Sequence, residues 1–181
     1  MYHVFESLPP KYQWIALVGL LIATLCVWLI QSRQDAALPP MSAPNSTLSL
    51  QFAWSSEGAK AIIDSWTAPQ KKIASYQLYI DFLLLLFYPV LLSLSCMLVA
   101  RYVSHPLAAL GIVLSWTVLL AGPLDAIENI FILRMLSRGP SNLLCHLATI
   151  SSAFKFALVF SVFGYWGLAL MQWIWSLIRE I

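Results

Sequence analysis

Three polar side chains at the end of a long apolar run are the residues of this chain best placed to do chemistry. Asp125, Glu128 and Asn129 are spaced by three and four residues, which places them on one face of a helix. Asp81 and Lys155 lie at the ends of two other apolar runs. Ionisable side chains at membrane depth are costly, so each of them is a candidate functional residue. These residues predict a site, but they identify neither a reaction nor a partner.

The composition is that of a membrane protein. Of the 181 residues, 60% are hydrophobic and 10% are charged, and the mean hydropathy is +0.79. Soluble domains have about half apolar and a quarter charged residues. The net charge of +2 comes without any block of Lys and Arg, so no nucleic-acid partner is expected. The three cysteines have no C-x-x-C spacing and predict neither a redox nor a metal site.

Four apolar runs reach the length of about 20 residues that a helix needs to cross a bilayer. We predict an all-α membrane protein, a four-helix transmembrane bundle forming a single membrane domain over residues 1–181, with spans at about 14–31, 77–101, 106–136 and 143–178. The first run is longer than a signal-peptide core and has no clean cleavage site, so we interpret it as a retained span.

Four spans place both termini on one side of the membrane, called side A, and the long connection over residues 31–75 on the other, called side B. Lys and Arg occur on both sides, so the sidedness stays open. The expected location is a plasma membrane or a bacterial inner membrane.

Residues 45–68 are predicted to form a small cap on side B. Residues 48–54 alternate between large apolar and smaller or polar side chains, the period of a short half-buried strand. A serine cap at Ser55 or Ser56 then favours an amphipathic helix up to Trp66. The second, third and fourth helices extend beyond the bilayer on side B with apolar surface that such a cap would cover. The alternative is an amphipathic helix that rests on the lipid surface.

The depth of the charged residues suggests that they meet. Asp81, Asp125 and Lys155 each lie at the side B end of an apolar run, so they share about one level. The predicted ligand-binding pocket under the cap comprises Asp81, Tyr88, Asp125, Glu128, Asn129, Ser151 and Lys155. One lysine cannot neutralise three carboxylates, so protonation, a metal ion, Arg134 or a cationic ligand must supply the balance.

Several roles fit this cluster. An ion pair of Lys155 with Asp81 or Asp125 can simply fix which helices are neighbours. In an enzyme, Asp125, Glu128 and Asp81 are the candidate catalytic residues, as general acid and base or as ligands of a divalent ion. In a carrier, carboxylates beside a proline kink can move protons or cations, although four spans are few for a transporter working alone. His146 points away from Lys155, so no metal site is predicted, and no cofactor follows from the sequence.

Short segments of the chain carry a resemblance. They are Phe52-Ala53, Ile62-Ile63-Asp64-Ser65-Trp66, Tyr79-Ile80-Asp81-Phe82, Asp125-Ala126-Ile127-Glu128-Asn129 and Lys155. With these segments the chain resembles a loose group of uncharacterised, mostly bacterial four-span membrane proteins, and the Asp-x-x-Glu-Asn element is the most specific of them. In that group the second connection carries several arginines, whereas here it has Arg101 and His105. The resemblance implies the architecture and the candidate site, and no known activity.

We interpret the chain as a non-catalytic integral membrane protein that binds a lipid-like ligand or serves as an accessory subunit of a larger membrane complex. The alternative is a small intramembrane enzyme that uses its carboxylate cluster on a lipophilic substrate. The expected partners are the lipid bilayer and, for an accessory subunit, other membrane proteins.

Overall fold

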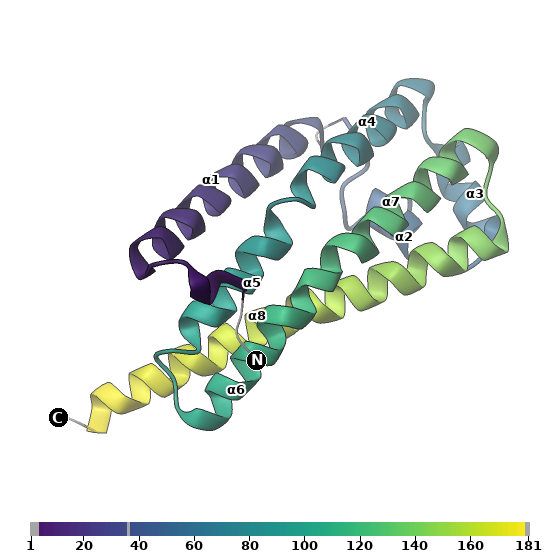
Figure 1. The fold of residues 1–181 in the computed structure, drawn as a ribbon. Coiled ribbons are helices and arrows are strands. Elements are labelled where there is room, and N and C mark those ends of the chain that lie inside the picture. Colours follow the sequence, from purple (N-terminus) through teal and green to yellow (C-terminus); the bar gives the residue numbers. More distant parts are fainter. Residues whose placement is uncertain (1–3, 36, 180–181) are drawn as a thin grey trace.

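The computed structural model describes residues 4–35 and 37–179, and all regular elements in these ranges are helices. Four helical segments of this part of the chain are long and apolar enough to cross a membrane (Figure 1). They are Pro10–Gln34, Ala68–Val99, His105–Arg138 and Asn142–Arg179. The prediction of an all-α, four-helix membrane bundle is confirmed, and the chain is a multi-pass membrane protein.

The first and last segments are continuous helices, α1 (Pro10–Asp35) and α8 (Asn142–Arg179), and a short 3₁₀ turn, η1 (Val4–Ser7), precedes α1. The second segment consists of α4 (Ala68–Leu84) and α5 (Tyr88–Val99). The third consists of α6 (His105–Thr117), a 3₁₀ turn η2 (Val118–Leu120) and α7 (Ala121–Arg138).

Prolines account for both interruptions. Pro89 has no N–H for the carbonyl of Leu85, and Pro123 has none for the carbonyl of Leu119, so the α-helical ladder cannot run through either point. The two interruptions lie side by side: a Cβ at Gly122 would be 3.2 Å from Cγ of Pro89 and 3.5 Å from the carbonyl oxygen of Leu85. A small residue at Gly122 therefore lets the two broken segments approach closely.

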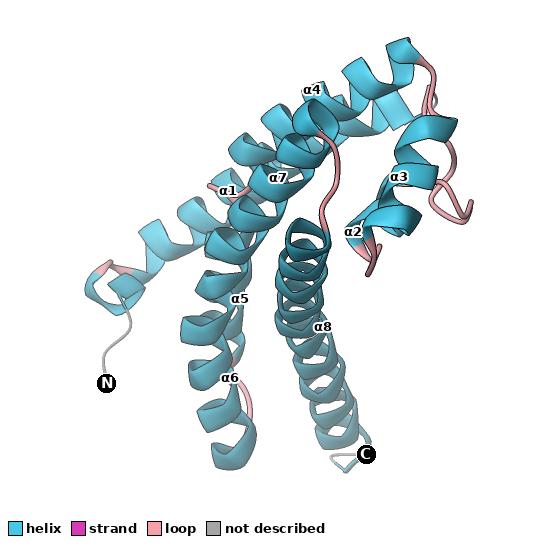
Figure 2. Cartoon of the chain, turned by 90° about the vertical axis from the view of Figure 1, so that its right-hand side faces the viewer, coloured by secondary structure: helices cyan, strands magenta, loops and turns pink. Residues whose placement is uncertain are grey.

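The helices form a bundle whose two ends differ. α7 packs along α8, α1 packs against α4 and α5, and α5 packs against α6. The start of α1, the α5–α6 connection and the end of α8 lie at one end of the bundle (Figures 1 and 2). The apolar core towards this end is Leu92, Cys96, Leu114, Val118, Ala121, Val162 and Tyr165. The connection between α1 and α4 covers the other end, which corresponds to side B.

That connection contains two short helices, α2 (Thr47–Gln51) and α3 (Ser56–Ser65). The predicted strand over residues 48–54 is wrong: the described residues contain no strand. The hydroxyl of Ser46 accepts the N–H of Ser49 at 3.1 Å and caps α2 instead. Leu50 is buried, but Phe52 and Trp54 are exposed, so the apolar alternation does not mark one buried face.

The predicted amphipathic helix is present, and it packs on protein. Ser55 caps α3 by accepting the N–H of Gly58 at 3.1 Å. The apolar cluster beneath the cap joins Leu50, Ala53, Ala59, Ile63 and Trp66 to Ala74 of α4, Ile132 and Met135 of α7, and Cys145 and Ala148 of α8. Hydrogen bonds fix the cap to α8. Asn142 Oδ1 accepts the N–H of Ser56 at 2.8 Å, and the hydroxyl of Thr149 donates to the carbonyl of Gln51 at 3.1 Å.

Candidate functional site

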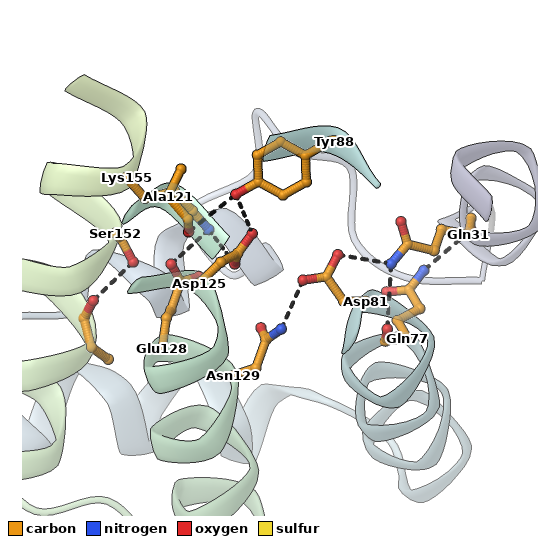
Figure 3. A network of polar contacts seen from close by, with 11 residues as sticks. Gln31, Gln77, Asp81, Tyr88, Ala121, Asp125, Glu128, Asn129, Ser152 and Lys155 are labelled. Atoms are coloured by element: carbon orange, nitrogen blue, oxygen red, sulfur yellow. Dashed lines mark hydrogen bonds and ion pairs between the residues drawn. The ribbon is translucent and has the colours of Figure 1, made fainter. Parts of the chain in front are cut away.

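Charged and amide side chains from four helices, α1, α4, α7 and α8, meet where the bundle joins the cap (Figure 3). Asp125, Glu128 and Asn129 project from one face of α7, as their spacing predicted. Lys155 reaches them from α8, and Asp81 reaches them from the last turn of α4. The charged residues predicted at one depth therefore lie close together, as expected from the sequence.

A buried lysine forms the centre of one half of the network. Nζ of Lys155 lies 2.7 Å from Oδ1 of Asp125 and 2.6 Å from Oε2 of Glu128. Tyr88, the first residue of α5, donates its hydroxyl to Oδ2 of Asp125 at 3.0 Å and to the carbonyl of Ala121 at 3.2 Å. Both oxygens of Asp125 are thus engaged. These contacts fix α5, α7 and α8 relative to one another in a low-dielectric environment, where such bonds are strong.

Asp81 belongs to the other half, and its partners are neutral. Oδ2 accepts the amide N–H of Asn129 at 2.7 Å, and Oδ1 accepts that of Gln31 from α1 at 3.0 Å. The side-chain amides of Gln31 and Gln77 each donate to the other residue's backbone carbonyl, at 3.4 and 3.5 Å. Sequence reasoning missed both glutamines. Gln31 ends the first apolar run, but its position there does not tell which helix it faces.

Six of the seven predicted site residues are in this network, and the seventh is not. Ser151 is buried on α8, one turn before Lys155, and it takes part in none of the contacts drawn in Figure 3. Its neighbour Ser152 lies beside Glu128 and donates to the carbonyl of Ala148 at 2.9 Å. The helical period predicted a serine on the face of Lys155, and the structure places the adjacent Ser152, rather than Ser151, beside Glu128.

The cluster holds three carboxylates and one lysine. Arg134, which sequence reasoning kept as a counter-charge, is exposed on α7 and forms no ion pair with a described residue. Among the described residues, no three His, Cys, Asp or Glu side chains lie close enough together to hold a metal ion. His146 packs its ring against Trp54, 4.6 Å between centroids, away from the site. Glu128 is fully buried, and its Oε1 has no hydrogen-bond partner in the described part of the chain.

A cavity of about 220 Å³ opens beside the cluster. Its polar lining comes from Gln31, Ser32, Thr47, Gln51, Gln77, Asp81, Asp125, Asn129 and Lys155, and its apolar lining from Trp28, Met41, Leu50, Trp66, Ala74, Leu78, Ile132 and Leu136. Tyr88, Glu128 and Ser151 do not line it. Sequence reasoning missed the contributions of α1, because an apolar span gives no signal of which residues face a cavity. The cap contributes Thr47, Leu50 and Gln51 from α2, so it forms part of the wall.

No protein family, curated protein or solved structure matched this chain in comparisons of sequence and fold. The resemblance to four-span bacterial proteins therefore stays a prediction.

Proposed function

We propose that this chain is a non-catalytic integral membrane protein that binds the head group of a lipid-like ligand in the cavity under the cap. The observation that carries the proposal is the set of residues that line the cavity. Acidic, basic and amide side chains line it together with tryptophan, methionine and leucine. An amphiphile needs this combination, because its head group requires hydrogen bonds and ion pairs while its tail requires apolar surface.

The size of the cavity fits a head group. Its volume of about 220 Å³ is below the 300–1,000 Å³ or so of pockets that bury most of a drug-sized molecule. The surrounding helices expose many apolar side chains, as a bundle in lipid must. A ligand with its head group in the cavity can leave its tail among lipid chains. The cavity itself is too small to enclose a large polar solute.

Native mass spectrometry of gently extracted protein tests the proposal. We expect extra mass that corresponds to an amphiphile. Ser32 of α1 lines the cavity, so Ser32→Trp should fill it and remove that mass. Leu29→Trp adds the same ring to an exposed position on the same helix that does not line the cavity, and it should retain the ligand. Wild-type protein without bound amphiphile, or ligand retained by Ser32→Trp, would contradict the proposal.

An intramembrane enzyme is the second candidate, and one observation favours it. Asp81 and Asp125 line the same cavity, so a lipophilic substrate bound there would contact two carboxylates, which can serve as general acid and base. If the protein is an enzyme, Asp125→Asn cannot convert its substrate, and the ligand bound to this variant should differ in mass from the ligand bound to the wild type. If the protein only binds, both should carry the same ligand and differ only in occupancy.

The partners and location are part of the same proposal. We place the protein in a plasma membrane or a bacterial inner membrane, where the bilayer supplies the ligand. As an accessory subunit it would bind a second membrane protein, and the same mass spectra would show the mass of that subunit in place of, or beside, an amphiphile.

A further inference from the structure

We propose that the head group bound in this cavity is an organic monocation, the amine or quaternary ammonium group of an amphiphile, and that Asp81 is the carboxylate that pairs with it. This inference rests on the proposed function and specifies the class of its ligand. Three observations support it. The hydrogen-bond partners of Asp81 are neutral, Lys155 already contacts two carboxylates, and aromatic side chains line the cavity.

The first step is that Asp81 is a carboxylate without a cation. Both of its oxygens accept N–H donors, from Asn129 and from Gln31. No Lys, Arg or His of the described residues lies within ion-pair distance of it. Asp81 is half-buried and lines the cavity, so a ligand can reach it. The amide donors orient the carboxylate but supply no positive charge.

The second step is that the lysine in the wall is not free for an anion. Lys155 contacts two carboxylates, Asp125 at 2.7 Å and Glu128 at 2.6 Å. Its positive charge is therefore already shared by two carboxylates, and Asp81 adds a further acidic side chain to the wall of the cavity. A phosphate or carboxylate head group would meet repulsion in a site of low dielectric, whereas a cation would be attracted. The cavity therefore selects positive charge.

The third step distinguishes an organic cation from a metal ion. No three His, Cys, Asp or Glu side chains of the described residues are arranged so that they could hold a metal ion. The rings of Trp28 and Trp66 and the side chain of Met41 line the same cavity, and aromatic faces attract alkylammonium groups while accommodating their carbon atoms. A head group with both charge and apolar surface uses all of this lining.

A set of probes with one tail and three head groups tests the inference. Purified protein in a neutral detergent is titrated with hexyltrimethylammonium, hexan-1-ol and hexanoate, and binding is measured by calorimetry. We expect the cation to bind at least about tenfold more tightly than the other two, a difference of about 1.4 kcal/mol, because only the cation is attracted both to the Asp81 carboxylate and to aromatic faces. Asp81→Asn should lower the affinity for the cation to that for the alcohol.

Asp64→Asn is the matched control, because it removes the same charge from an exposed position of α3. It should bind like the wild type. Equal affinities for cation and alcohol, or tightest binding of hexanoate, would overturn the inference while leaving head-group binding intact. Failure of the wild type to bind any probe would also overturn it, and the ligand mass of the extracted protein then decides separately on the proposed function. If Asp81→Asn does not fold, the order of the three affinities on the wild type alone decides.

Discussion

At the scale of residues, Lys155 supplies the positive charge that pairs with two carboxylates of the cluster, Asp125 and Glu128. Its ammonium group is buried, as are Asp125 and Glu128, and a buried ion pair seldom adds stability over apolar side chains of the same size. Removing one partner is different, because it leaves the other charges buried and unpaired. The three residues are thus expected to be strongly coupled.

The first prediction tests this coupling. Lys155→Met leaves Asp125 and Glu128 facing each other without a cation and should lower the free energy of unfolding by about 3–5 kcal/mol. The triple variant with Asp125→Asn and Glu128→Gln should recover most of this loss. Reversible unfolding in mixed micelles measures both. Lys60→Met on the exposed face of α3 is the control and should stay within about 0.5 kcal/mol of the wild type. A triple variant less stable than Lys155→Met would show that the charges are not coupled as inferred.

At the scale of elements, close contacts at small residues set the packing of the bundle. Gly111 of α6 faces Tyr165 of α8 so closely that a Cβ there would collide with the tyrosine hydroxyl and lie 3.0 Å from Cβ of Ala100. That hydroxyl is itself buried without a hydrogen-bond partner in the described part of the chain. The ring of Tyr165 therefore contributes to the apolar core, whereas its hydroxyl group makes no hydrogen bond with a described residue.

The second prediction follows from this contact. Gly111→Ala should destabilise the protein by about 1–3 kcal/mol through overpacking. Tyr165→Phe alone should be neutral or stabilising, because it removes an unsatisfied hydroxyl, and it should rescue part of the Gly111→Ala loss. Gly164→Ala, where nothing lies within 4 Å of the new Cβ, is the control and should lose no stability. Additive effects of Gly111→Ala and Tyr165→Phe would argue against the contact.

Elements also show how far the sequence could predict the structure. Apolar length was enough for the four membrane helices, and helical spacing with common depth brought Asp81 to Asp125 and Lys155. The strand failed because alternation over residues 48–54 competes with a local side-chain cap at Ser46, and a strand also needs a partner that no nearby segment supplies. The glutamines of α1 and α4 could not be assigned, since their pairing depends on the rotation of two apolar helices.

At the scale of the whole molecule, the two ends of the bundle differ in structure. One end carries the start of α1, the α5–α6 connection and the end of α8, whereas the cap and the cavity lie at the other end (Figure 1). The polar cluster therefore lies towards the capped end of the bundle. The proposed ligand would approach the cavity from that end.

The last prediction places these ends on opposite sides of the membrane. Single cysteines are introduced at Lys11, Tyr102, Glu57 and Arg138, all exposed, after replacement of the three native cysteines. With a membrane-impermeant maleimide on sealed vesicles, Lys11→Cys and Tyr102→Cys should label together, and Glu57→Cys and Arg138→Cys should label together from the opposite face. Detergent-opened vesicles, in which all four should react, control for reactivity. Labelling of Glu57→Cys with Lys11→Cys would mean that α1 does not cross the bilayer. Which pair labels from the cytoplasmic side fixes the orientation, and with it the compartment from which the cavity can take its ligand.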